Sequence, residues 1–214
     1  MEPKGKTMAR QGLFITFEGP EGSGKSTHSK LLCDFLRKRG YKVLHTREPG
    51  GVAISEKIRK ILLDPRNKDM DTVCEMLLYM AARAQIVEKK ILPALKKGKI
   101  VVCDRFIDAT LAYQGYAGGL GLKLIRDIGR LVTKDISPDI TFLLDIETKK
   151  GLLRSGNNKD RMERKSIAYH RKVRKGYLDI ARREPKRVKI VRAVGKISDA
   201  QEKIRDIALC HLKR

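Results

Sequence analysis

Positions 19–27 read GPEGSGKST, which is the spacing of a loop that binds the phosphates of a nucleotide. Glycines at such positions let backbone N–H groups turn towards an anion that side chains would obstruct. Lys25 can reach the outer phosphates, and the hydroxyl of Ser26 can hold Mg²⁺. The expected nucleotide-binding residues are Gly19, Gly22, Ser23, Gly24, Lys25, Ser26 and Thr27.

The segments on either side of this loop are those that a phosphate-binding loop requires. The apolar run Leu13–Phe17 predicts a buried strand, and Lys25–Arg39 predicts a helix that ends at Gly40. The N-terminus of that helix adds the positive end of its dipole to the anion site. A chance glycine-rich turn rarely has both neighbours, so the sequence predicts that the chain binds a nucleoside triphosphate.

Short apolar runs alternate with helical patterns along the chain, which predicts a parallel sheet covered by helices on both faces. The predicted strands are Leu13–Phe17, Tyr41–Leu44, Ile100–Cys103, Ile140–Leu144 and Val188–Val191. At 214 residues the chain has room for one α/β domain with a sizeable core. We expect that domain to span residues 12–214, after a flexible polar tail at residues 1–11.

Two capping-box patterns predict where long helices begin. The pattern Thr72-x-x-Glu75 begins a helix that we expect to run to about Leu92, because Pro93 would kink or end it. The pattern Ser198-x-x-Gln201 begins the C-terminal helix.

The chain is strongly basic, with a formal net charge of +23. Residues 149–192 hold 17 Lys and Arg against 4 Asp and Glu, largely on predicted helices. Such a run is usually a solvated helix face that also steers anionic phosphates; a nucleic-acid partner is the alternative. Aromatic residues are sparse, which speaks against a groove for single strands.

No stretch has the length of a signal peptide or a membrane span, so we expect a cytoplasmic protein. The four cysteines lie without C-x-x-C spacing. Three of them have apolar surroundings, so we expect buried, reduced thiols rather than disulfides or zinc ligands.

Ligands of open parallel sheets bind at the carboxyl ends of the strands. Arg47 follows the second predicted strand, and Asp104 and Arg105 follow the third. Asp104 is the expected partner of Mg²⁺, and Arg105 can fork onto a second phosphate. The alternative is an Asp–Arg pair that only caps a loop.

Two further groups could contact a nucleotide. Tyr79 and Arg83 are four residues apart, so they share one face of the long helix and could meet a base and its phosphate. The polar segment Arg154–Glu163 could close over a nucleotide and bring a cation to the transferred group. The alternatives are an ordinary amphipathic helix and a surface loop.

Taken together, four motifs strongly resemble the thymidylate kinase family: FEGPEGSGKST at 17–27, TREPGG at 46–51, DRF at 104–106 with AYQG at 112–115, and DRME at 160–163. The resemblance covers about residues 13–210. It implies the P-loop NTPase fold of the nucleoside-monophosphate-kinase type, with a five-stranded parallel sheet. It also implies transfer of the γ-phosphoryl group of ATP to dTMP, with Mg²⁺, usually in a homodimer.

The resemblance also implies the substrate-binding residues: Glu21, Arg47, Pro49, Tyr79, Arg83, Arg105, Thr110, Tyr113 and Gln114. By that likeness, Glu21 bonds the 3′-hydroxyl of dTMP, while Arg47 and Arg105 hold its phosphate.

On the base side, the resemblance implies that Tyr79 stacks on thymine and that Arg83 faces its edge. Thr110 and Gln114 lie near the base, and Tyr113 crowds the sugar 2′ position.

An acceptor phosphate is already anionic, so catalysis needs alignment and charge neutralisation rather than a strong base. Lys25, Asp104 with Mg²⁺, and one more cation would do this. Some relatives carry that cation in the phosphate loop, where this chain has Gly22. We therefore expect it in a lid at about residues 154–165, from Arg154 or Arg161, with Lys159 third.

Two other activities stay open from the sequence. One is a kinase for another pyrimidine monophosphate such as dUMP. The other is a P-loop ATPase stimulated by nucleic acid.

Overall fold

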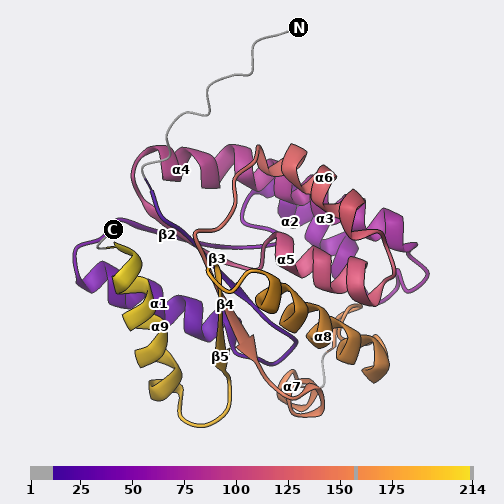
Figure 1. Ribbon diagram of the computed structural model, residues 1–214. Coiled ribbons are helices and arrows are strands. Elements are labelled where there is room, and N and C mark those ends of the chain that lie inside the picture. The colour runs from indigo at the N-terminus through magenta and orange to yellow at the C-terminus, as the bar shows by residue number, and fades with distance from the viewer. Residues whose placement is uncertain (1–11, 157–158, 213–214) are drawn as a thin grey trace, which may run out of the picture.

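The computed structural model describes residues 12–156 and 159–212, and its centre is one sheet of five parallel strands in the order β2-β3-β1-β4-β5 (Figure 1). The strands are β1 (Phe14–Glu18), β2 (Val43–Arg47), β3 (Ile100–Asp104), β4 (Ile140–Asp145) and β5 (Val188–Arg192). The predicted tail at 1–11 and two residues of the predicted lid, 157–158, lie outside the described residues.

The burial of the strands follows from their place in the sheet. Every residue of β1 and β3 is buried, because helices cover both faces of the inner strands. The edge strands β2 and β5 are only partly buried. The predicted parallel sheet is confirmed, but β2 begins two residues later than expected and includes Arg47.

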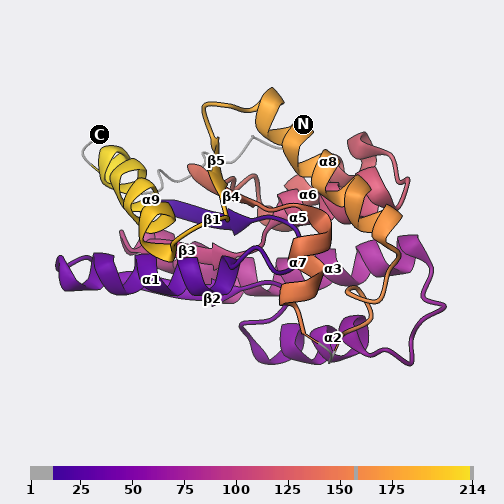
Figure 2. The same cartoon turned by 90° about the horizontal axis from the view of Figure 1, so that it is seen from below.

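The helices cover the two faces of the sheet (Figures 1 and 2). Their bounds are α1 (Lys25–Lys38), α2 (Ala53–Leu63), α3 (Thr72–Ile86), α4 (Leu92–Lys96), α5 (Ile107–Thr110), α6 (Leu122–Thr133), α7 (Thr148–Arg154), α8 (Ile167–Arg183) and α9 (Ile197–Leu212). Two π-helical segments, η1 (Val87–Ile91) and η2 (Leu111–Ala117), extend α3 and α5.

The core has layers on both faces of the sheet. Phe17 and Phe142 pack with α1 and α9 on one face, where their ring centroids lie 5.2 Å apart. Phe14 and Phe106 meet edge to face on the other, beneath the end of α3 and η1. A further cluster joins α3, η2 and α8 around Tyr177. Packing on both faces of the sheet holds the strands, and therefore the loops at their carboxyl ends, in place.

The strand order places the phosphate loop. The connection from β1 runs to β2 on one side of β1, and the connection from β3 runs past β1 to β4 on the other side, which opens a crevice at the carboxyl end of β1. The loop at 19–24 lies in that crevice and leads into α1. Figure 2 shows α7 lying across the same end of the sheet.

Both capping-box predictions are wrong. Asp71 caps α3, because its side chain accepts from the backbone N–H groups of Val73 and Cys74. The Glu75 side chain is buried instead of reaching back to the helix start.

At the other predicted box, α9 already begins at Ile197 and Gln201 bonds the buried His28. The helical path that begins with α3 also continues past Pro93 to Lys96, after the π-helical turn of η1.

The cysteine prediction is partly wrong. Cys33 and Cys103 are buried thiols, whereas Cys74 and Cys210 are exposed on α3 and α9. All four are free. Among the described residues, no helix combines the length and the apolar character needed to cross a bilayer.

Candidate active site

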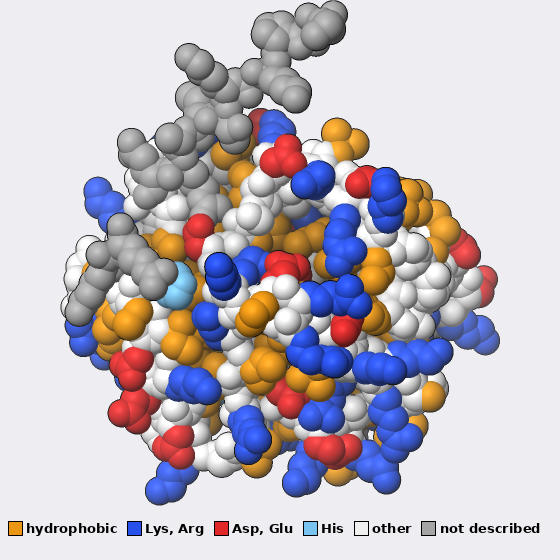
Figure 3. Space-filling model, viewed as in Figure 1, with side chains coloured by type: hydrophobic (Ala, Val, Ile, Leu, Met, Phe, Trp, Pro, Cys, Tyr) orange, Lys and Arg blue, Asp and Glu red, His pale blue; other side chains and the backbone are white. Residues whose placement is uncertain are grey.

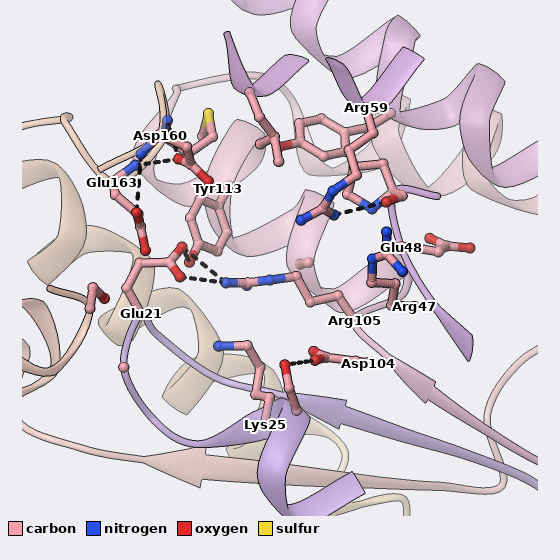
Figure 4. Close-up of a pocket in the computed structure, with 18 of the residues that line it drawn as sticks. Glu21, Lys25, Arg47, Glu48, Arg59, Asp104, Arg105, Tyr113, Asp160 and Glu163 are labelled. Carbon is pink, nitrogen blue, oxygen red and sulfur yellow. Dashed lines mark hydrogen bonds and ion pairs between the residues drawn. The ribbon is translucent and has the colours of Figure 1, made fainter. Parts of the chain in front are cut away.

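A cavity of about 420 Å³ opens at the carboxyl ends of β1, β2 and β3 (Figure 4). It is lined by fourteen of the residues singled out from the sequence: Glu21, Gly22, Gly24, Lys25, Ser26, Thr27, Arg47, Pro49, Tyr79, Asp104, Arg105, Thr110, Tyr113 and Gln114. Gly19 and Ser23 lie in the same loop but do not line the cavity. Residues from five separate segments therefore meet in one place.

The phosphate loop forms one end of the cavity. Lys25 Nζ donates to the carbonyl of Pro20 over 2.8 Å, so it lies folded over the loop. Gly22 has φ +65, and a Cβ there would lie 2.0 Å from the carbonyl oxygen of Gly151 in α7. A side chain at position 22 has no room, which supports the expectation that an additional cation comes from outside this loop.

Ser26 and Asp104 meet beside Lys25. The Ser26 hydroxyl donates to Asp104 Oδ2 over 2.5 Å. A hydroxyl and a carboxylate oxygen side by side are hard ligands that suit Mg²⁺, which commonly takes one or two protein oxygens and completes its shell with phosphates and water. The residues present therefore fit the metal that the sequence predicted.

Glu21 and Arg105 cross the middle of the cavity (Figure 4). Arg105 Nη2 donates to both Glu21 oxygens over 2.9 and 2.8 Å, and the Tyr113 hydroxyl donates to Oε1 over 2.6 Å. Burial alone would raise the pKa of Glu21, but Arg105 and Lys25 outweigh it and lower this pKa to about 2. Glu21 is therefore an acceptor at neutral pH.

Two further arginines, Arg47 and Arg59, line the cavity. Arg47 Nη2 contacts both oxygens of Glu56 over 3.0 Å, and Arg59 donates to the carbonyl of Pro49 over 2.9 Å. Burial, together with the nearby Arg47, lowers the pKa of Arg59. Sequence reasoning missed Arg59, because it stands in a run of charged residues on α2 and nothing in that run marks it.

The base-side residues are only partly where the sequence put them. Tyr79, Thr110 and Gln114 line the cavity, but Arg83 does not. Arg83 is 2% exposed and donates to Glu48 over 2.7 Å and to the Thr110 hydroxyl over 3.0 Å. Arg83 therefore lies beneath the pocket wall and contacts it through two residues that line the cavity, Glu48 and Thr110.

The two arginines of the predicted lid, Arg154 and Arg161, lie outside the cavity wall. Arg154 donates to the carbonyl of Ala193 over 3.0 Å, and Arg161 is buried 2.5 Å from Glu75 in an ion pair. The residues of this segment that do line the cavity are Ser155, Asp160, Met162 and Glu163.

Two buried groups next to the phosphate loop have shifted pKa values. Burial, and then Arg105, lowers the pKa of Lys25 to about 8. Burial, with Asp108 nearby, raises the pKa of Glu18 to about 8. Glu18 accepts from the N–H of Phe106 over 2.6 Å and from the Tyr177 hydroxyl over 2.8 Å, so it fixes the turn that carries Arg105. Sequence reasoning had no signal for this role.

A parallel sheet in this order, with a phosphate loop after its central strand, defines the P-loop fold of the nucleoside-monophosphate-kinase type. The family model described as thymidylate kinase matches residues 17–204. The chain therefore belongs to the thymidylate kinase family.

Individual relatives agree with this assignment. The chain is 50% identical over 200 residues to a thymidylate kinase of Syntrophotalea carbinolica, covering 90% of this chain and 93% of the relative. It is 47% identical over 194 residues to a thymidylate kinase of Symbiobacterium thermophilum, covering 90% and 91%. The crystal structure of thymidylate kinase from Ehrlichia chaffeensis matches with a TM-score of 0.77 and 35% identity, over 92% of this chain and 98% of that one.

Proposed function

We propose that this protein transfers the γ-phosphoryl group of ATP to dTMP, giving ADP and dTDP. The observation that carries the proposal is a single cavity with a phosphate loop at one end and arginines at the other. Lys25 and the Ser26–Asp104 pair face the donor end, and Arg47, Arg59 and Arg105 surround the acceptor end. Two anionic substrates brought end to end need this distribution of charge.

The acceptor residues then divide between phosphate and nucleoside. Arg47 and Arg105 take the dTMP phosphate, and Arg59 joins them because it lines the same wall. Glu21 accepts from the 3′-hydroxyl, which suits a carboxylate whose pKa is about 2. Tyr79 offers its ring to the base, while Tyr113 beside Glu21 limits room at the sugar 2′ position.

The donor residues bind and align ATP. Ser26 and Asp104 would hold Mg²⁺, which supplies charge neutralisation between the donor phosphates when bound. Lys25 exchanges its contact with Pro20 for phosphate oxygens. The acceptor oxygen is already anionic, so alignment and electrostatic stabilisation suffice for transfer.

The additional cation at the transferred group comes from Arg154 in this proposal. Its Cβ lies 3.1 Å from the position of a Cβ built on Gly22, so α7 holds it beside the phosphate loop. Its guanidinium needs to leave only the carbonyl of Ala193. Arg161 is tied into the protein interior, and Lys159 remains the third candidate.

Two variants separate these candidates. Arg154→Ala is expected to lower kcat more than it weakens dTMP binding, with little loss of stability, because the residue is exposed. Arg161→Ala is expected to lower the melting temperature, because it leaves Glu75 buried without its partner. An unchanged kcat in folded Arg154→Ala would move the role to Lys159.

The proposed function is tested by ADP release with Mg-ATP and a panel of acceptors: dTMP, dUMP, dCMP, AMP, GMP, thymidine and single-stranded DNA. We expect turnover to favour dTMP strongly, with little for thymidine. A preference for dUMP or another monophosphate would mean that the acceptor residues were wrongly assigned.

A nucleic-acid-stimulated ATPase is the other activity that the panel separates. Figure 3 shows Lys and Arg side chains gathered over α7 and α8, whose sequences carry this charge. In our proposal this surface is a solvated face that attracts anionic nucleotides. Turnover only with DNA would contradict this.

We further propose a homodimer that forms through α2, α3 and α6. Large apolar side chains are exposed on these helices, which pack side by side: Ile54, Ile61, Val73, Leu77, Leu124 and Leu131. A second copy of the chain would cover them. We expect light scattering to give a dimer that Leu77→Glu with Leu131→Glu dissociates, whereas Leu153→Glu, an exposed leucine on α7, leaves it intact. A wild-type monomer would contradict the proposal.

We place the reaction in the cytoplasm. All four cysteines are free, which suits a reducing compartment. Cell fractionation tests this placement; recovery of the protein outside the cytoplasmic fraction would contradict it.

A further inference from the structure

Glu75 contacts two residues at the acceptor end of the cavity, Gln114 and Arg161, which lie far apart in the sequence. It lies on the inner side of α3, and its side chain is 2% exposed. Gln114 Nε2 donates to Glu75 Oε1 over 2.7 Å, and Arg161 Nη1 lies 2.5 Å from Oε2 in an ion pair. One buried carboxylate is therefore shared by Gln114 of the pocket wall and by Arg161 of residues 160–163, which we call the covering segment.

The contact with Glu75 fixes which end of the Gln114 amide faces the pocket. A carboxylate paired with an arginine only accepts hydrogen bonds, so it must receive the NH₂ group of Gln114. The carbonyl oxygen lies at the other end of the planar amide. Gln114 lines the cavity, and no residue in the described part of the chain donates a side-chain contact to this oxygen. The wall therefore offers the ligand an acceptor.

An acceptor at this position distinguishes pyrimidines by their ring nitrogen. Thymine and uracil carry N–H at N3, whereas cytosine carries a lone pair there. A buried site built to receive a ring N–H leaves two acceptors facing each other when cytosine enters, and such mismatches are strongly disfavoured. Because Glu75 orients the Gln114 amide, it contributes to the choice of base.

The second oxygen of Glu75 holds the covering segment. Arg161 also donates through Nε to the carbonyl of Leu62 over 2.7 Å, and its backbone N–H donates to Leu63 over 3.0 Å. Its neighbours Asp160 and Met162 line the cavity. The pair therefore ties this segment to α3 directly above the pocket wall.

We propose that Glu75 is a positioning residue that holds the Gln114 amide with its carbonyl oxygen towards the pocket, so that the enzyme selects acceptor bases with a ring N–H, and that it anchors the covering segment through Arg161. The inference rests on the proposed function and names the origin of its base preference.

The test compares kcat/KM for dUMP and dCMP, two acceptors that share a sugar and lack the 5-methyl group; inhibition constants replace rates where turnover is too slow. Glu75→Gln removes the charge but keeps the shape. A glutamine can donate as well as accept, so the Gln114 amide can turn over. We expect the dUMP:dCMP ratio to fall by about tenfold, the size of one buried hydrogen bond.

Three variants show whether the effect acts through Gln114. Gln114→Met is expected to lower the same ratio, and adding Glu75→Gln to it is expected to change the ratio no further. Asp34→Asn removes a carboxylate that also pairs with an arginine, Arg37, on α1, where both side chains are about half exposed, and is expected to keep the wild-type ratio.

The outcomes separate the two proposals. A wild-type ratio in folded Glu75→Gln, or in Gln114→Met should Glu75→Gln fail to fold, overturns the role of Glu75 and leaves the proposed function intact. A wild-type protein that does not phosphorylate dTMP overturns the proposed function itself.

Discussion

The two ends of the pocket are built in different ways. At the donor end, the loop is one run of consecutive residues, and Lys25 contacts Pro20 only five positions away. At the acceptor end, Arg83 pairs with Glu48 across 35 positions, and Arg161 bonds Leu62 across 99. The phosphate-binding loop is therefore encoded locally, although its contact with Asp104, 78 positions from Ser26, needs a distant strand. Recognition of the acceptor depends on the whole fold.

This difference decides what a mutation does. A donor-end side chain such as Lys25 contributes to chemistry more than to folding, because its partners are the loop and the ligand. An acceptor-end arginine that is fully buried has a carboxylate as its partner, so its loss leaves an uncompensated charge inside the protein.

Lys25→Ala gives the largest expected change. We expect kcat to fall by roughly 10²- to 10³-fold, as when other preorganised donors to a developing charge are removed. Stability should hold or rise, because burial lowers the pKa of this lysine to about 8 and its charge is a cost to the folded state at neutral pH. Steady-state rates and thermal melting measure both; near-normal turnover would exclude the role of Lys25 in phosphate binding.

Arg83→Met tests the acceptor end. Removal of one partner of a buried pair costs about 3–5 kcal/mol of unfolding free energy. The matched control is Arg37→Met, whose pair with Asp34 is about half exposed and is expected to contribute about 0–1 kcal/mol. Urea unfolding measures both. Equal losses of unfolding free energy in the two variants would mean that the buried Arg83 pair contributes no more to stability than an exposed pair.

The pH dependence of ATP binding tests the charge state of Lys25 at the donor end without a mutation. Free Lys25 loses its proton near pH 8, and bound phosphates favour the protonated form. The KM for ATP should therefore be flat below pH 8 and rise above it, approaching about tenfold per pH unit. A KM that stays constant to pH 9.5 would mean that Lys25 remains charged in the free enzyme.

Glu18→Gln should change only the pH profile of stability. Because the folded protein holds this proton to about pH 8 and the unfolded chain releases it near the ordinary glutamate pKa of 4.5, the unfolding free energy falls as pH rises between these values. Gln keeps an acceptor for the N–H of Phe106, and its NH₂ group can donate to the Tyr177 oxygen, whose hydroxyl donates to Glu18 in the wild-type protein. We expect the variant to lose part of this slope; an identical slope in chemical unfolding from pH 5 to 8 would contradict the shift.

The success of the sequence-based predictions also depends on whether a feature is local or is formed by distant residues. The strands, the phosphate loop and α1 were predictable, because each is specified by a run of neighbouring residues. Glu75 shows the limit: its spacing from Thr72 fits a capping box, yet Asp71 caps the helix and Glu75 meets Gln114 and Arg161.

Other features that the sequence left open have the same physical origin. Arg161 and Arg154 share a polar segment, but only the structure shows that Arg161 points into the interior while Arg154 lies beside the phosphate loop. Arg59 is one charge among several on α2, and it faces the pocket only because α2 packs against α3.

Phosphorus NMR of the wild-type protein with Mg-ATP and dTMP is the first measurement to make, because it observes the phosphoryl transfer itself. We expect dTDP and ADP to appear in equal amounts as ATP and dTMP disappear, with no comparable release of inorganic phosphate. Inorganic phosphate and ADP without dTDP would contradict it and would assign the cavity to ATP hydrolysis.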